Sequence, residues 1–214
     1  MENDMILQKN KNALEILGKT YKNAKPALVF KNEFELLVSV MLSAQCTDVR
    51  VNKTTEKLFE NYNTPDSVAN MDIALLEDYI RSCGLYKNKA KNIKAASIVI
   101  CEKFGGNVPQ TREELMSLPG VGRKTANVVL SVGFCKPAFA VDTHVFRVAN
   151  RIGLANGKTP DEVEKQVTAI IPQEDWGKAH HWLIYHGRQV CHSQRPDCEN
   201  CCVRLQCDYY KNKV

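Results

Sequence analysis

Apolar residues recur every three or four positions along most of this chain, which is the spacing of one face of an α-helix. Segments with this period cover about residues 7–21, 34–41, 51–62, 87–104, 161–171 and 176–189, with shorter ones near 67–70 and 72–82. We find no pattern typical of a strand, no internal repeat and no low-complexity tract. The sequence therefore predicts an all-α fold.

One break in the helical pattern is flanked by residues that can bind or react. The helix-forming segment 113–118 ends at Pro119, whose ring fixes φ and removes an amide donor. Gly120 and Gly122 follow, and glycine permits positive φ and a close approach of another backbone. A second helical pattern begins at Arg123, so the amides of this turn would lie at a helix N-terminus, which attracts anions. A glycine pair alone is equally consistent with a plain turn between helices.

Two charged residues near this turn are candidates for chemistry. Lys124 would lie in the first turn of the second helix, where the macrodipole disfavours a cation by about 0.3–1 kcal/mol. The same field favours the neutral amine, which attacks carbonyl carbons, although a solvated or phosphate-binding lysine is the alternative. Asp142 comes just before an amphipathic segment, where it is either the N-cap of a helix or a catalytic carboxylate.

Length and net charge are compatible with several domain organisations and functions. The chain has 214 residues, of which 44% are hydrophobic, enough for one large domain or two modest ones. A net charge of +5 is compatible with nucleic-acid binding and with many other functions. The N-terminus has no apolar run of signal-peptide or membrane length, so we expect a cytoplasmic protein of bacterial type with no membrane partner.

Eight of the nine cysteines fall into two groups. The first group is scattered singly through apolar helical segments, where we expect reduced core residues. Its members are Cys46, Cys83, Cys101 and Cys135. The second group forms a C-x6-C-x2-C-x5-C pattern in a basic tail and consists of Cys191, Cys198, Cys201 and Cys207. Four clustered thiols predict a metal site, and zinc or an iron–sulfur cluster would suit the spacing equally.

Two sequence motifs and this cysteine spacing resemble a known family. The motifs are L-P-G-V-G-R-K-T-A at 118–126 and A-V-D-T-H-V-F-R-V at 140–148. They resemble the helix-hairpin-helix signature of the endonuclease III family of DNA glycosylases, and the resemblance covers nearly the whole chain. It implies a two-domain fold: a six-helix domain over 26–136 that carries the hairpin, and a discontinuous helical domain from 1–25 and 137–214. DNA would bind in the cleft between them.

The resemblance also implies an activity and a mechanism. Members of this family remove oxidised pyrimidines from duplex DNA in base excision repair, and they cleave the strand at the resulting abasic site. By resemblance, Lys124 attacks the sugar C1′ and forms a Schiff base that permits β-elimination, while Asp142 assists proton transfer or stabilises positive charge. We therefore expect a monomeric, nucleoid-associated enzyme whose partner is double-stranded DNA with an oxidised pyrimidine or an abasic site.

The remaining site residues are implied by the same resemblance. Gln45, in L-S-A-Q-C-T-D, would fill the gap left by an extruded nucleotide, and Leu85 would be an apolar wedge in the DNA stack. The cysteine pattern would hold a [4Fe-4S] cluster, with Cys202 as a spare thiol beside it. The other expected DNA contacts are Leu118, Gly120, Val121, Gly122, Arg123, Thr143, His144, Arg147 and Arg195.

Two alternative functions remain at this point. An adenine-mismatch glycosylase of the same family would lack the lysine and carry an additional C-terminal domain, neither of which this sequence matches. A non-catalytic, zinc-bearing DNA-binding module would use the hairpin only to hold phosphate. Three histidines, His180, His181 and His186, fall on different faces of their helix, which favours packing or contact with the DNA backbone over metal binding.

Overall fold

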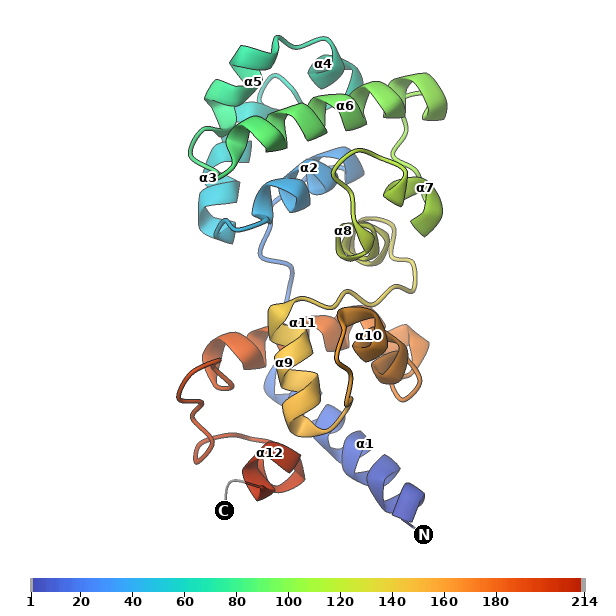
Figure 1. Ribbon diagram of the computed structural model, residues 1–214, viewed down its shortest axis with the longest axis vertical. Helices are drawn as coiled ribbons and strands as arrows, with labels where there is room; N and C mark the ends of the chain where they lie inside the picture. The colour runs from blue at the N-terminus through green and yellow to red at the C-terminus, as the bar shows by residue number, and fades with distance from the viewer. Residues whose placement is uncertain (1, 213–214) are drawn as a thin grey trace. The chain divides into compact units, whose positions relative to one another are not determined.

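The computed structural model describes residues 2–212, and these residues form helices and no β-strand (Figure 1). The all-α prediction is therefore confirmed. The chain divides into two compact units, Pro26–Lys136 and the combination of Met1–Lys25 with Pro137–Val214. Within the described part of the chain, no helix is both long enough and apolar enough to cross a membrane.

The unit Pro26–Lys136 is built around one buried helix, α2 (Glu33–Ser43), and one long helix, α6 (Tyr86–Phe104). Its other α-helices are α3 (Asp48–Phe59), α4 (Pro65–Ala69), α5 (Ile73–Ile80), α7 (Arg112–Met116) and α8 (Arg123–Val128). The long α6 packs against α4, α5 and α2, and α2 also packs against α3 and α8 (Figure 1). Every residue of α2 from Phe34 to Leu42 is buried, because the helix is covered on all sides.

Local side-chain chemistry decides where these helices begin. Thr47 caps α3 by accepting a hydrogen bond from the Arg50 amide, so this helix starts at Asp48, three residues before the start that its apolar pattern predicts. Thr64 and Ser67 form a reciprocal capping box at α4. After Val128 the helix widens into a π-helical turn, Val129–Gly133, before the chain leaves this unit.

The second unit combines the N-terminal helix with the C-terminal part of the chain. Its α-helices are α1 (Glu2–Thr20), α9 (Thr143–Ile152), α10 (Pro160–Thr168), α11 (Trp176–Gln189) and α12 (Asp208–Lys211). The 3-10 turns Gln173–Asp175 and Arg204–Gln206 precede α11 and α12. Helix α11 packs against both α1 and α9, and α12 packs against α9.

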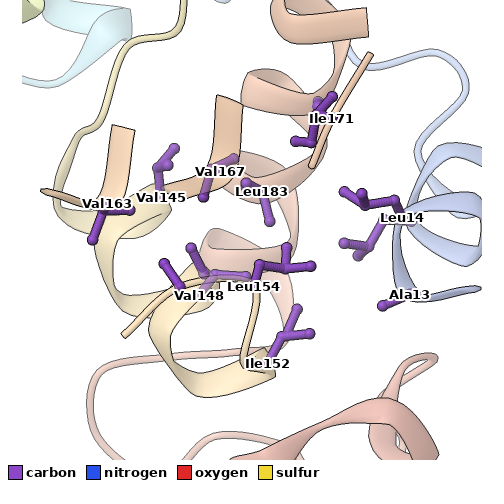
Figure 2. Close-up of a cluster of buried hydrophobic side chains, with 14 of the residues drawn as sticks. Ala13, Leu14, Val145, Val148, Ile152, Leu154, Val163, Val167, Ile171 and Leu183 are labelled. Carbon is purple, nitrogen blue, oxygen red and sulfur yellow. The ribbon is translucent and has the colours of Figure 1, made fainter. Parts of the chain in front are cut away.

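One hydrophobic cluster holds these distant segments together (Figure 2). On α9 the apolar face predicted from the sequence is fully buried, with Val145, Val148 and Ile152 pointing into the cluster. Leu14 from α1 and Leu183 from α11 reach the same cluster. Burying each such side chain contributes roughly 1.5–3 kcal/mol. The cluster can therefore offset the conformational entropy that is lost when α1 is held against the C-terminal helices.

We expected the four singly placed cysteines to be core residues, but the structure does not bury all of them. Cys83 is fully buried, and Cys46 and Cys101 are half-buried. Cys135 is exposed and adopts a left-handed backbone with φ 51°. It lies in the turn that follows the π-helical segment, where the apolar periodicity no longer predicts the direction of a side chain.

Candidate active site and cysteine cavity

The glycine turn between α7 and α8 is a tight hairpin. The Val121 amide donates to the Leu118 carbonyl at 3.1 Å, which closes the turn. Gly120 has φ +77°, a conformation that favours glycine. Gly122 has φ −94° and is extended, so only one of the two glycines needs the left-handed backbone. Leu118 and Val121 bury their side chains, which leaves only their backbone for outside contacts.

We expect Gly120→Ala to destabilise this unit and Gly122→Ala to leave its stability unchanged. A Cβ at residue 120 would lie 2.8 Å from Asn92 Cβ of α6, whereas a Cβ at residue 122 meets no atom within 4 Å. Left-handed backbone adds a cost of about 1–2 kcal/mol at residue 120. Thermal unfolding of both variants measures the difference, and equal shifts in Tm would contradict it.

Gly122→Ala, whose fold should be intact, can also test whether the hairpin backbone contacts phosphates. The measurement is its affinity for duplexes of several sequences, since phosphate contacts do not depend on sequence.

Lys124 is exposed in the first turn of α8, immediately after this hairpin. The N-cap of α8 is Gly122, which provides no side-chain cap for the first amides of the helix. Arg123, beside the lysine, is half-buried. The structure therefore places an accessible amine next to backbone N–H groups that can bind an anion.

Asp142 is the N-cap of α9, as its position before the amphipathic segment predicted. Its Oδ1 accepts a hydrogen bond of 2.7 Å from the Val145 amide, and its backbone is extended. The cap uses one carboxylate oxygen, and the side chain is half-buried. Thr143, the first residue of the helix, is exposed, and His144 is half-buried.

Gln45 and Leu85 are brought together by the fold. Gln45 follows the C-terminus of α2, and Leu85 is the N-cap of α6. Both are exposed and both have positive φ, 55° and 58°, which is uncommon for residues other than glycine. A Cβ on the neighbouring Gly84 would lie 4.0 Å from the Gln45 carbonyl oxygen, so the two turns lie side by side.

Four of the C-terminal cysteines line one small cavity. They are the predicted set Cys191, Cys198, Cys201 and Cys207. Cys202 is exposed and is not part of this lining. Among residues 2–212, no three His, Cys, Asp or Glu side chains converge where a single metal ion could bind. The four thiols instead surround a space, an arrangement in which different thiols can bind different metal atoms.

His186 also lines this cavity. Its Nδ1 lies 3.0 Å from the Tyr21 hydroxyl and its Nε2 lies 3.5 Å from Cys201 Sγ. Burial lowers the pKa of His186 to about 4 and raises the pKa of the Cys201 thiol to about 12, so both groups are neutral at pH 7 without a bound cation. His180 is also buried, with Nδ1 2.8 Å from the Ala140 carbonyl oxygen. Both histidines therefore pack within the fold.

Two arginines of α9 connect this helix to the cysteine loop. Arg147 donates to the carbonyls of Cys191 and Gly187, each at 2.9 Å. Arg151 donates to Cys191 Sγ at 3.5 Å and to the His192 carbonyl at 2.6 Å. The resemblance suggested a DNA contact for Arg147, but its guanidinium is largely occupied inside the fold.

Arg151 was not among the predicted site residues, although one signal for it was present in the sequence. Arg151 follows Arg147 by one helical turn, on the side of α9 that its apolar residues leave free. Arg195, in contrast, is exposed in the loop between Cys191 and Cys198 and has φ 49°. It therefore remains available for an outside contact.

Comparison with known proteins defines the class to which this fold and hairpin belong. Residues 38–173 match the family of HhH-GPD superfamily base excision DNA repair proteins. The chain is 50% identical to endonuclease III of Rickettsia conorii over 198 residues, which cover 92% of this chain and 94% of that protein. It is 45% identical to endonuclease III of Escherichia coli over 204 residues, which cover 94% and 96%. The chain therefore belongs to the endonuclease III family.

A solved structure agrees over nearly the full length. The chain superposes on a trapped covalent intermediate of endonuclease III with DNA, with a TM-score of 0.92 and 47% sequence identity. The match covers 97% of this chain and 98% of that one. The glycosylase fold that the resemblance implied for this chain is therefore confirmed.

Proposed function

We propose that this DNA glycosylase and abasic-site lyase removes oxidised pyrimidines from duplex DNA, with Lys124 as the nucleophile. The observation that carries the proposal is the exposed amine of Lys124 in the first turn of α8, directly after the hairpin. The family membership supplies the class of reaction, and the position of the amine supplies the residue. A lysine that only held phosphate would not form a covalent bond with the substrate.

The proposed reaction has four steps. The neutral amine of Lys124 attacks the sugar C1′ as the bond from C1′ to the damaged base breaks, and the base leaves with a proton. The sugar ring opens to a Schiff base, which acidifies the neighbouring C2′ hydrogen. Loss of that proton expels the 3′ phosphate by β-elimination, and water then releases the lysine. We assign Asp142 to proton transfer or to stabilising the positive charge that develops on the sugar.

We propose that the hairpin and two inserted side chains hold the DNA. The backbone amides around Gly122 would bind a phosphate, which fixes position without reading sequence. Extrusion of a nucleotide costs a few kcal/mol and is easiest where damage has weakened stacking. Gln45 and Leu85, exposed on adjacent turns, are suited to fill the space that the nucleotide leaves. Arg123, Thr143, His144 and Arg195 are proposed as further contacts.

We further propose that the cysteine cavity holds a [4Fe-4S] cluster. The four lining thiols fit such a group because they surround a space and do not converge on one point. When bound, the cluster cross-links the loop and supplies no catalytic step. Arg147 and Arg151 then hold that loop on α9, so that Arg195 is presented to the DNA backbone.

Borohydride trapping tests the proposed reaction. Borohydride reduces a Schiff base to a stable amine, so the wild-type protein should become covalently linked to a duplex with one thymine glycol. The linked species is measured on a denaturing gel and its site by peptide mass spectrometry. We expect one protein chain per linked duplex, because we expect the protein to act as a monomer. If no oxidised pyrimidine and no abasic site gives a link, the lyase mechanism is wrong and a non-catalytic module is favoured.

We expect Asp142→Asn to bind damaged DNA normally. Its reaction rate should fall by about 10²–10⁴-fold, which is the usual contribution of a general acid or base. Asparagine is an equally good N-cap, so α9 and the Tm should be preserved. Single-turnover rates on thymine-glycol duplexes measure the effect. An unchanged rate would mean that Asp142 is only a helix cap.

A further inference from the structure

A buried lysine lies beneath the two turns that carry Gln45 and Leu85. Lys89 is 7% exposed, and its Nζ donates to the carbonyls of Leu42 at 2.8 Å and Ala44 at 2.7 Å. Buried lysines are rare unless they have partners. Here the partners are the last carbonyls of α2, the negative end of the helix dipole.

The same residue is bonded to the second turn through its backbone. Lys89 lies in the first turn of α6, and its amide donates to the carbonyl of Leu85 at 3.1 Å. Its ammonium thus reaches the carbonyl of Ala44, directly before Gln45, while its backbone is fixed to the wedge residue. One residue therefore connects two turns that are far apart in the sequence.

Other contacts show that the two turns form one packed unit. Burial and the nearby buried thiol of Cys83, which precedes the Leu85 turn, raise the pKa of Cys46, the residue after Gln45. Cys83 Sγ also lies 3.7 Å from Thr54 Oγ1 of α3. These contacts fix the base of both turns and leave their tips exposed.

Both tips have an unfavourable backbone. Gln45 and Leu85 have φ values of 55° and 58°, in the left-handed region that non-glycine residues rarely occupy. Such conformations persist only where the surrounding structure enforces them, and they are frequent at functional sites. The ammonium of Lys89 supplies charge-assisted hydrogen bonds directly before one of these strained residues.

We propose that Lys89 is a positioning residue that holds the Gln45 and Leu85 turns at a fixed mutual spacing for extrusion of the damaged nucleotide. The proposal rests on the proposed function, in which these two side chains enter the DNA. Because Lys89 is buried, it would act through the two turns and not by touching the DNA or the reacting atoms. Its removal should therefore impair extrusion more than the chemistry that follows.

Three variants separate this role from general stability. Lys89→Met removes the ammonium and keeps an unbranched side chain with good helix propensity. Lys89→Arg keeps the charge. Lys91→Met removes an exposed charge from the same helix and is the matched control.

Hydrogen–deuterium exchange of the DNA-free protein tests the structural half of the proposal. In Lys89→Met we expect faster exchange in peptides covering residues 42–48 and 82–89, with the peptides of α4, α5 and α8 unchanged. Lys89→Arg should restore part of the protection, and Lys91→Met should match the wild type. Unchanged exchange at both turns, or equal loosening of the whole unit, would overturn the proposal.

Single-turnover kinetics test the functional half. An abasic duplex has no base to extrude, so strand cleavage there bypasses much of the step that Lys89 would assist. We expect Lys89→Met to slow base removal from a thymine-glycol duplex by about tenfold or more, because the variant loses the charge-assisted hydrogen bonds to the Leu42 and Ala44 carbonyls. Cleavage of the abasic duplex should fall much less.

A proportional loss of both reactions would make Lys89 a purely structural residue and would overturn the proposal. If the wild type acts on neither duplex, the proposed function fails. In that case the exchange measurement still decides whether Lys89 holds the two turns.

Discussion

Lys124→Ala is expected to lose borohydride trapping and strand cleavage while it retains binding to damaged duplexes. Removing a covalent nucleophile from an enzyme lowers the rate by about 10³-fold or more. Binding should persist because the hairpin backbone, Gln45 and Leu85 are all unchanged. Lys124 is exposed and alanine is a strong helix former, so the Tm should change little. Trapping yield, single-turnover rates and a binding titration on one thymine-glycol duplex measure the three quantities.

A control is needed because any lost lysine weakens electrostatic attraction to DNA. Lys103→Ala removes an exposed lysine from the last turn of α6 and should trap at the wild-type rate. Comparison at two salt concentrations separates the loss of charge from the loss of the nucleophile. If Lys124→Ala is trapped as fast as the wild type, a different amine is the nucleophile.

Cys201→Ser is expected to lose bound iron and to destabilise the C-terminal loop, whereas Cys202→Ser should keep both. Cys201 lines the cavity and Cys202 is exposed outside it. Loss of a structural metal centre can cost on the order of 4 kcal/mol, because metal binding is coupled to folding. Iron content per chain, the visible absorbance of the cluster and thermal unfolding provide the three measurements.

Because Cys201 and Cys202 are adjacent, the two serine variants are well-matched controls for each other. The two variants differ by one position in sequence and have the same chemical change. Val203 and Cys207 belong to the hydrophobic cluster of this unit, so loosening of the loop should also increase proteolysis near α12. Iron loss in Cys202→Ser alone would reverse the assignment of the ligand. Bound zinc in place of iron in the wild type would contradict the proposed cluster.

Several features could be predicted from the sequence because they depend on neighbours along the chain. The 3.6-residue period of α9 predicted its buried face, and that face is formed by Val145, Val148 and Ile152. The position of Asp142 before this helix predicted its cap. The hairpin between two helices followed from Pro119 and the glycines after it. Local propensities and hydrogen bonds determine all of these features.

The choice among equivalent residues depended on the three-dimensional structure. The sequence treats Gly120 and Gly122 alike, but only Gly120 has positive φ and lies against α6. Cys201 and Cys202 offer alternative ligand spacings, and the direction of each side chain separates them. Local sequence patterns do not predict which residue of each pair has the special environment, because that environment arises from packing against segments that are distant along the chain.

Long-range polar contacts were the least predictable feature. Lys89 is one of five lysines in α6, and no sequence pattern singled it out, yet its ammonium is buried against the end of α2. Arg147 reads as a DNA contact, yet it binds carbonyls of α11 and of the cysteine loop. The sequence by itself determined the helices, the hairpin and the clustering of cysteines near the C-terminus. Only the tertiary structure decided which charged side chains are buried, because a long side chain can reach partners on any element that folds against its own.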